Sequence, residues 1–185
     1  MHTRAPNSND VTTALVEVLP YEASWPRMFE AERTLLERVL AQWLCGPIEH
    51  IGSTAVPGLM AKPVIDIMAP VRDLNASRPA VAALVSAEYA YFPYKSDVMH
   101  WFCKPSPGMR THHLHLVPFN SLLWRQRLTF RDALRRSPSL ATEYAKLKLR
   151  LAQRYPFERE AYTEAKSPFV TRVLGTKSAT DAGAP

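Results

Sequence analysis

The amino-acid sequence predicts one domain of the α/β (α+β) class, a mixed sheet flanked by helices with a C-terminal helical segment. Up to about residue 120, short apolar segments bounded by Gly, Pro and polar residues are typical of strands. From residue 121 onward, apolar residues recur at the spacing of helices. A chain of 185 residues with 46% hydrophobic residues is long enough to bury one core and too short for a second large domain.

The two ends of the chain differ in composition from its centre. Residues 1–12 are polar and are predicted to form a disordered lead, residues 13–174 a single folded domain, and residues 175–185 a disordered tail. No apolar run approaches the roughly 18 residues that span a bilayer, and the N-terminus has no apolar signal core. We therefore expect a cytoplasmic protein with no membrane partner.

The first elements are predicted to be a strand and a helix. TALVEVLPY has the β-branched content of a short strand that ends at Pro20. Ser24 and Pro26 give the start of a helix, and apolar residues at helical spacing continue it over residues 25–44.

The next segments are predicted to form most of the sheet. Residues 47–51 form a brief strand, and GSTAVPGL forms a turn because its Pro and Gly prevent a long helix. Residues 63–70 are apolar nearly throughout, as in a strand buried on both faces. The remaining patterns predict a helix over residues 76–88 and strands over 89–94, 100–104 and 111–117.

The last third of the chain is predicted to be helical and basic. Helices are expected over residues 121–136, 138–154 and 157–173. The net charge is +6, and the surplus of Lys and Arg lies in this third. Such helices bind RNA in some proteins and are only solvated in others, so RNA is one candidate partner.

The cysteines give no sign of a disulfide scaffold or of a zinc site. Cys45 and Cys103 lie far apart and outside any CxxC motif. This spacing favours two unpaired and mostly buried thiols.

A lone acid and several histidines are the candidate catalytic and metal-binding residues. Because strand side chains alternate between faces, Asp66 shares a face with Met68, and His113 shares a face with His115. If these strands are neighbours, the acid and both histidines converge on one cleft, where His50 from the preceding strand joins them. A carboxylate with imidazoles can hold a divalent metal or shuttle a proton.

The structural alternative is that these groups only satisfy hydrogen bonds. The histidines would then lie beneath the helical layer, and Asp66 would cap a turn or pair with an Arg. Three histidines within residues 112–115, opposite a buried acid, favour a functional role, since a buried charge must be paired, bonded or used.

The turn formed by Gly52, Ser53 and Thr54 is a candidate phosphate-binding segment. A glycine lets the backbone approach a ligand closely, and successive N–H groups with hydroxyls can hold phosphate oxygens. The alternative is a tight turn whose Ser or Thr caps the next short helix.

Three cationic residues are further candidates for binding phosphate. Lys62 and Arg110 lie at the ends of the strands that carry the acid and the histidines, where they reach either a ligand or only solvent. Lys166 shares a helix face with Tyr162, four residues away, and can meet phosphate as a point charge. An exposed lysine on an amphipathic helix is the alternative.

Four segments together resemble the GrpB family. They run in that family's order over residues 15–174 and read VEVLPYEASWPRMFEAE, IEHIGSTAVPGLMAKPVIDIM, RTHHLHLV and FRDALRRSPSLATEYAKLKLRLAQRYPFEREAYTEAKSPFV. The resemblance implies a nucleotidyltransferase-like fold, in which a Gly-Ser turn grips a triphosphate. Carboxylates on the following strands then bind magnesium ions. That pattern maps here onto Gly52, Ser53 and Asp66.

The sequence departs from the active pattern at the metal ligands. Met68 stands where a second acid is expected, and the later strand offers His113 and His115 in place of a carboxylate. A single Asp can hold one Mg²⁺ through water and phosphate oxygens, or the Asp and histidines can select Zn²⁺ or Mn²⁺.

Three functional hypotheses follow from these features. The first is a metal-dependent nucleotidyltransferase-like enzyme that acts on a nucleotide or a phosphorylated small molecule, with His113 or His115 as metal ligand or base. The second is a non-catalytic module on the same fold that binds nucleotide, RNA or protein. The third is a metal-dependent or proton-shuttling enzyme unrelated to nucleotides, built on Asp66 and the histidines.

Overall fold

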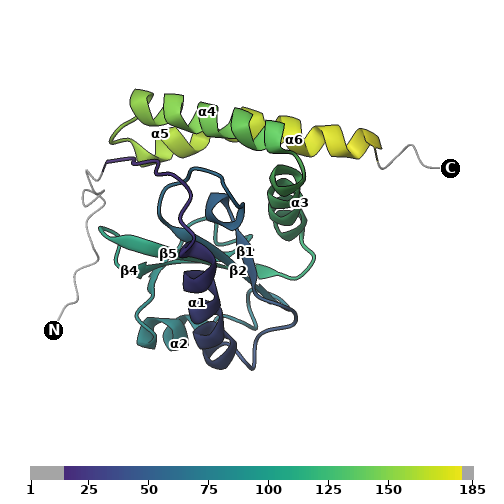
Figure 1. Cartoon of the computed structure of the whole chain (residues 1–185). Helices are drawn as coiled ribbons and strands as arrows, with labels where there is room; N and C mark the ends of the chain where they lie inside the picture. The colour runs from purple at the N-terminus through teal and green to yellow at the C-terminus, as the bar shows by residue number, and fades with distance from the viewer. Residues whose placement is uncertain (1–14, 181–185) are drawn as a thin grey trace.

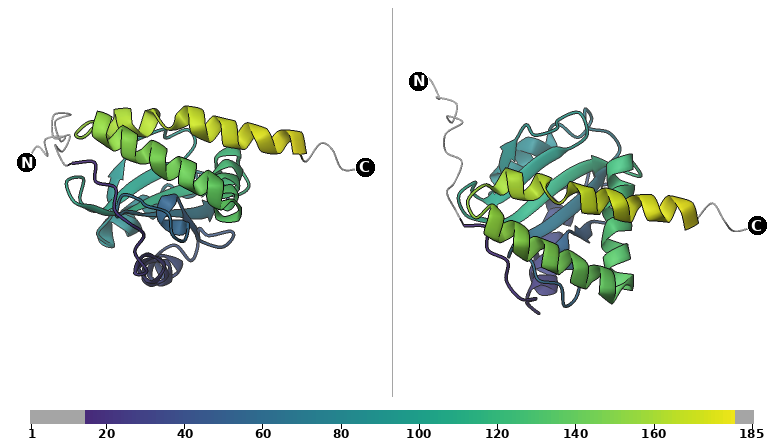
Figure 2. Two further views of the ribbon diagram at one scale, coloured as in Figure 1. Left: turned by 45° about the horizontal axis from the view of Figure 1, so that its top comes forward. Right: turned by 90° about the horizontal axis from the view of Figure 1, so that it is seen from above.

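A computed structural model describes residues 15–180, so the predicted lead over residues 1–12 lies outside the described residues. Helices α1 (Trp25–Val39) and α2 (Ala80–Ser86) lie over one face of a central sheet. The C-terminal helices lie over the other face (Figures 1 and 2). The predicted fold class is therefore confirmed: a mixed sheet flanked by helices, followed by a helical segment.

Five strands form the sheet in the order β1-β2-β5-β4-β3. The neighbours β2 and β5 run parallel, and the other pairs are antiparallel. In the register of the parallel pair, Asp66 lies opposite His113, and Met68 lies opposite His115. The strand bounds are β1 Glu49–Ile51, β2 Ile65–Val71, β3 Ala90–Phe92, β4 His100–Pro105 and β5 Arg110–Pro118.

Serine caps start the first two C-terminal helices where the sequence predicts them. The Ser121 hydroxyl accepts a hydrogen bond from the backbone N–H of Trp124, and the Ser137 hydroxyl accepts one from Leu140. The bounds of the four helices are α3 Leu122–Arg136, α4 Pro138–Arg154, α5 Arg159–Glu164 and α6 Ser167–Thr180.

The predicted single helix over residues 157–173 is two helices in the structure. Pro168 has no N–H with which to continue α5, so α6 starts anew after Lys166. Helix α6 also runs to Thr180, past the residue where the tail was expected to begin.

Two other elements are shorter in the structure than the sequence predicts. Helix α1 ends at Val39 rather than near residue 44, because Leu44 already forms a β-bridge with Val71. The predicted strand over residues 13–20 is reduced, within its described part, to one bridge between Leu19 and Ala61. Local propensity cannot foresee such pairings, which depend on strands distant in sequence.

Alternation along β2 divides the sheet into a core face and a site face. Ile65 and Ile67 point toward α1, where they pack with Leu36 and Leu40, all of them fully buried. Each such side chain contributes about 1.5–3 kcal/mol by leaving water. The opposite face carries Asp66.

Helices cover the site face at two places. At one end, Trp124 of α3 covers the buried Met68. Elsewhere, Tyr144 of α4 and Phe169 of α6 pack on Val56 and Leu59 of the loop before β2. The acid of β2 thus lies between two covered regions.

The cysteines are unpaired, as expected, but differ in exposure. Cys103 is buried in β4, whereas Cys45 is exposed, so the prediction of a mostly buried thiol is wrong for Cys45. None of the helices in residues 15–180 has the length and apolar character needed to cross a membrane.

A buried carboxylate joins α1 to the sheet on the core face. Glu32 is 8% exposed, accepts a hydrogen bond of 2.8 Å from the Tyr89 hydroxyl and lies 3.1 Å from Nζ of Lys104. Burial, with the charge of Glu32, raises the pKa of Tyr89. Removing one partner of such a pair leaves the others buried without compensation.

We expect Glu32→Ala to lower the free energy of unfolding by about 2–4 kcal/mol, because Lys104 and Tyr89 lose their shared acceptor. Urea unfolding measures the loss. The control is Glu37→Ala on the same helix, whose pair with Arg33 is half-exposed and which should change stability by no more than about 0.5 kcal/mol. Equal effects of the two substitutions would contradict the role given to Glu32.

Candidate functional site

The centre of the site face is a hydrogen-bonded acid and imidazole on the two parallel strands. Oδ1 of Asp66 lies 2.9 Å from Nδ1 of His113, and the two side chains are 31% and 17% exposed. Trp101 of β4 packs its ring 5.1 Å from that of His113. The other ring nitrogen of His113, Nε2, is buried and has no hydrogen-bond partner among the described residues.

The surroundings of Asp66 keep its carboxylate ionised. Burial by itself raises the pKa of Asp66. The hydrogen bond and charge of His113, together with His115 and Arg127, outweigh burial and lower that pKa below its ordinary value. A negative charge therefore persists in a region that is otherwise cationic.

Gly52 is required by the position of Asp66. Its φ of +71° and ψ of −169° form a conformation that is essentially restricted to glycine, and a Cβ atom built on it would lie 2.3 Å from Oδ2 of Asp66. The same atom would lie 3.0 Å from Cβ and Cγ of that acid, so a simple rotation of the carboxylate does not relieve the contact. The turn thus packs its backbone directly against the acid.

The other two residues of the turn have different surroundings. The Ser53 side chain is partly exposed, and its hydrogen bond to Tyr144 acts to lower the pKa of that phenol, although burial raises this pKa to about 12 overall. Thr54 is buried, donates to the carbonyl of Val64 at 3.2 Å and lies 3.0 Å from Nε2 of His50. Thr54 therefore fixes the loop and does not face the site, unlike the role predicted for it.

His50 does not join the acid, contrary to the expected convergence. It lies opposite Ile67 in the sheet register and stacks on Phe29 of α1, with ring centroids 4.7 Å apart, so it belongs to the core face. Burial is the main cause that lowers the pKa of His50 to about 4. The misplacement follows from strand alternation, because Ile51 and not His50 is the residue opposite Asp66.

His115 lies on the site face but deeper than His113. It is 7% exposed, and its Nδ1 lies 3.3 Å from the sulfur of Met99. Burial, followed by the charge of Arg127, lowers the pKa of His115 to about 3. This histidine is neutral and enclosed.

The donor set around Asp66 does not match a two-metal centre. Within residues 15–180, no group of three His, Cys, Asp or Glu residues is placed to hold a metal ion. Met68, at the position of the second acid, is fully buried in an apolar cluster. A single hard cation would take Asp66 as its protein ligand, with water and ligand oxygens completing its shell.

The predicted phosphate-binding cations lie near the acid, around two aromatic rings. Lys62 and Lys166 place Nζ 5.0 and 4.4 Å from the centre of the Tyr162 ring. The guanidinium of Arg110 lies 5.4 Å from the Trp101 ring, and its Nε donates to the carbonyl of Pro107. The charge of Asp66 acts to raise the pKa of both lysines, which places them within its electrostatic reach.

Two further cations of this region are not predicted from the sequence. Lys148 of α4 is 2% exposed and donates to the carbonyl of Met60, and the charge of Arg159 of α5 acts to lower the pKa of Lys62. One signal was available for Lys148, which lies at helical spacing from the buried Tyr144 and Leu151. For Arg159 there was none, because only the folding of α5 brings it to the site.

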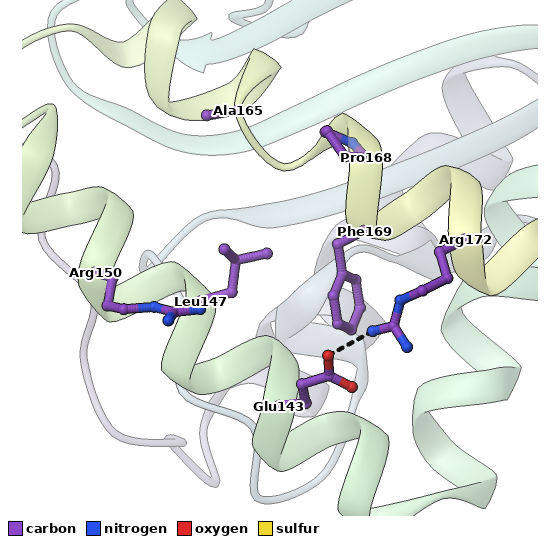
Figure 3. Close-up of a pocket in the computed structure, with 7 residues that line it drawn as sticks. All are labelled: Glu143, Leu147, Arg150, Ala165, Pro168, Phe169 and Arg172. Atoms are coloured by element: carbon purple, nitrogen blue, oxygen red, sulfur yellow. Dashed lines mark hydrogen bonds and ion pairs between the residues drawn. The ribbon is translucent and has the colours of Figure 1, made fainter.

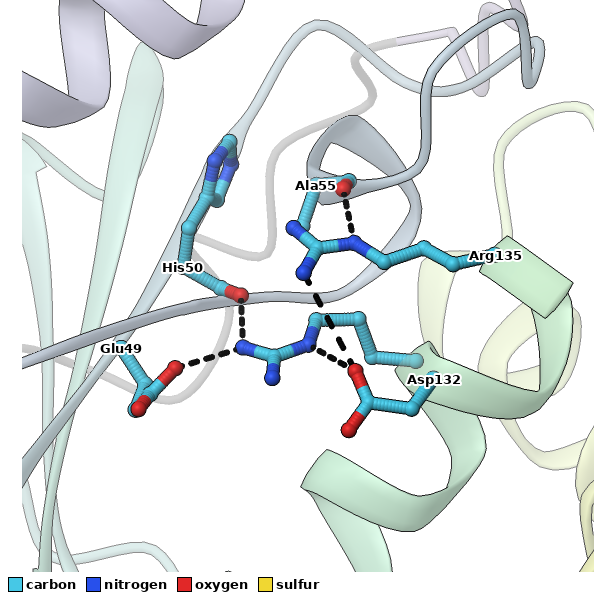
Figure 4. A network of polar contacts seen from close by, with 6 residues as sticks. Glu49, His50, Ala55, Asp132 and Arg135 are labelled. Carbon is cyan, nitrogen blue, oxygen red and sulfur yellow. Dashed lines mark hydrogen bonds and ion pairs between the residues drawn. The ribbon is translucent and has the colours of Figure 1, made fainter.

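Arginines of α3 hold the strand and turn that precede the acid (Figure 4). Arg131 contacts Oε2 of Glu49 at 2.6 Å and the carbonyl of His50 at 3.0 Å. Arg135 donates through Nε to the carbonyl of Ala55 at 2.9 Å. These bonds fix both ends of the segment that contains Gly52.

A groove between α4 and α6 lies apart from this site (Figure 3). It has a volume of about 320 Å³, and its lining includes the ion pair of Glu143 and Arg172 at 2.5 Å. None of its lining residues belongs to the group around Asp66. The groove is therefore distinct from the candidate site on the sheet face.

Comparison with known proteins identifies the family of this chain. The model of the GrpB protein family matches residues 15–176. The chain therefore belongs to the GrpB family.

Named relatives and a solved structure agree with this assignment. The chain is 42% identical to a UPF0157 protein of Pseudomonas aeruginosa, over 86% of this chain and 66% of that protein. It is 32% identical to the glutamate-rich protein GrpB of Alkalihalophilus pseudofirmus, over 86% of this chain and 94% of that protein. The crystal structure of conserved protein GrpB from Enterococcus faecalis superposes with a TM-score of 0.77 at 32% identity, covering 85% of this chain and 94% of that one.

We expect Gly52→Ala to lower the free energy of unfolding by about 2–4 kcal/mol, because backbone strain at positive φ adds to the collision with Asp66. The matched control is Gly58→Ala, where φ is +76° but no atom lies within 4 Å of the added Cβ. Its cost should be the strain alone, about 1–2 kcal/mol. Chemical denaturation of both variants compares them, and equal losses would show that the turn does not press on the acid.

Proposed function

We propose that this GrpB-family chain is a nucleotidyltransferase-like enzyme that binds a nucleotide or a phosphorylated small molecule on the Asp66 face of the sheet. The observation that carries the proposal is the pair of Asp66 and His113, in which Nδ1 is held by the acid while Nε2 is buried without a partner among residues 15–180. A buried polar atom without a partner is costly unless a ligand completes it.

The pair supplies proton transfer. By accepting a hydrogen bond from Nδ1–H of His113, Asp66 fixes the tautomer in which Nε2 of the neutral ring has a free lone pair. Nε2 then accepts the proton of an attacking hydroxyl or water, and Asp66 stabilises the imidazolium that forms. In the reverse role, the protonated ring donates to a leaving oxygen.

The other residues of the site bind and orient the substrate. The Gly52 and Ser53 turn lies against the acid and offers backbone and hydroxyl groups to phosphate oxygens. Lys62 and Lys166 supply positive charge. A divalent ion, Mg²⁺, Mn²⁺ or Zn²⁺, would take Asp66 as its protein ligand and neutralise phosphate charge when bound.

A non-catalytic module that binds nucleotide or RNA is the second candidate. It is favoured by the buried Met68 at the position of the second acid, because one carboxylate alone lacks the two-metal chemistry of active nucleotidyltransferases. The basic helices would then provide the binding surface. Binding without turnover, unchanged in Asp66→Asn, would select this candidate.

A panel of nucleotides tests the proposal, each with Mg²⁺, Mn²⁺ or Zn²⁺ and again with chelator. Thermal unfolding identifies the nucleotide that stabilises the protein, and product analysis then measures turnover. We expect Asp66→Asn and His113→Gln each to lower turnover by about 10²–10⁴-fold, since both remove the proton-transfer pair. The control Asp97→Asn changes an exposed acid and should leave turnover unaltered. Full turnover in His113→Gln would reject the proton-transfer role of the pair, and no turnover in the wild type would reject the enzyme.

A further inference from the structure

Four cations from distant parts of the sequence gather at one end of the Asp66 face. Lys62 precedes β2, Arg110 begins β5, Arg159 begins α5, and Lys166 lies between α5 and α6. Lys62 and Lys166 share the ring of Tyr162, and Arg110 and Arg159 each act to lower the pKa of Lys62. We call these four residues the cation cluster.

The cluster lacks compensating negative charge. None of its members forms an ion pair with a carboxylate in the part of the chain whose side chains are described. Asp66 is the acid within electrostatic reach, and it is already bonded to His113. In addition, Nε of Arg159 is buried and has no hydrogen-bond partner among the described residues. An unpaired buried donor among like charges indicates an anionic ligand.

We propose that the cation cluster binds the phosphate chain of a ligand with two or more phosphate groups, and that it does so without a metal ion. The inference rests on the proposed function, because the chain must lie beside Asp66 and His113 to be a substrate. One phosphate carries a charge of about −1.5 to −2, so a single phosphate leaves roughly half of the charge of four cations uncompensated. The cations thereby take the role that a second metal has in other phosphoryl-transfer sites.

The protonation of the lysines gives the site a characteristic pH dependence. Burial, together with the charges of Arg159 and Arg110, lowers the pKa of Lys62 to about 8, and the charge of Asp66 opposes this shift. Burial, together with the charges of Lys62 and of Arg127 in α3, lowers the pKa of Lys166 to about 7, and the charge of Asp66 opposes this shift.

The remaining titratable groups that face these lysines come from α4 and α5. They are Lys148 and Tyr162. Burial, followed by the charge of Lys166, lowers the pKa of Lys148 to about 7. Burial raises the pKa of Tyr162, whose ring lies under Lys166. Lys62 and Lys166 are therefore partly neutral near pH 8. A bound polyanion favours their charged forms, so binding takes up protons and weakens as pH rises from about 7 to 9.

Calorimetric titration with inorganic tripolyphosphate in the presence of EDTA tests the proposal. We expect one site per chain, an affinity at least about tenfold above that for orthophosphate, and proton uptake revealed by buffers of different ionisation enthalpy. Lys62→Met with Lys166→Met should lower the affinity at least about tenfold. The control Lys146→Met replaces an exposed lysine of α4 and should have no effect.

Thermal unfolding of the double variant separates loss of binding from loss of folding. Because Met keeps the apolar stem of Lys and removes repelling charges, the unfolding midpoint of the double variant should equal or exceed that of the wild type. A nucleoside triphosphate tighter than tripolyphosphate would identify a nucleotide ligand, and equal affinities would identify the phosphate chain itself. Absence of binding in EDTA, or a loss no larger than that of Lys146→Met, would overturn the proposal.

The two proposals fail in different ways. Tripolyphosphate binding without turnover of any nucleotide would support phosphate-chain binding by the cation cluster and reject the proposed nucleotidyltransferase-like activity. Metal-dependent turnover that requires Asp66, without tripolyphosphate binding in EDTA, would support the enzyme and reject the cluster.

Discussion

The parallel pairing of β2 and β5 determines the rest of the site. Its register places Asp66 beside His113, and a shift of either strand by one residue would turn that strand's side chain to the opposite face and separate the two. The antiparallel pairing of β1 with β2 places Ile51 opposite Asp66, so Gly52, the next residue, lies against the acid and admits no Cβ there. The turn, the acid and the imidazole therefore form one unit, which the arginines of α3 hold from outside.

The C-terminal helices add the cation cluster to that unit. The break between α5 and α6 sets Lys166 over the Tyr162 ring, on which Lys62 also lies. Unpaired cations that are partly buried repel one another, so they reduce stability in the free protein. A phosphate chain would remove that repulsion on binding, and the same charges would then orient it toward His113. The cost to folding and the gain in binding thus have the same origin.

Much of this arrangement can be derived from the sequence, because strand alternation and helical periodicity are local. Alternation places His113 and His115 on one face, which Asp66 shares if the two strands are neighbours, and the GrpB resemblance adds an expected role for Gly52 and Ser53. The same rule, applied to the register of β1, excludes His50, but the register is visible only after folding. The cation cluster could not be predicted from the sequence, since Arg159 and Lys62 are distant along the chain and are brought together only by the tertiary structure. The phosphate-binding role predicted for Thr54 has a local alternative, because its hydroxyl donates a hydrogen bond to the Val64 carbonyl at the end of the same loop.

The central claim is that Asp66 fixes the His113 ring so that Nε2 faces the ligand. Nitrogen-15 NMR of the histidine rings, in wild type and Asp66→Asn, tests it most directly. In the neutral ring of the wild type we expect the proton on Nδ1 and an unprotonated Nε2, whose resonance shifts when a stabilising nucleotide is added. In Asp66→Asn this tautomer should lose its preference. A proton on Nε2 in the wild type, with Nδ1 unprotonated, would contradict the account.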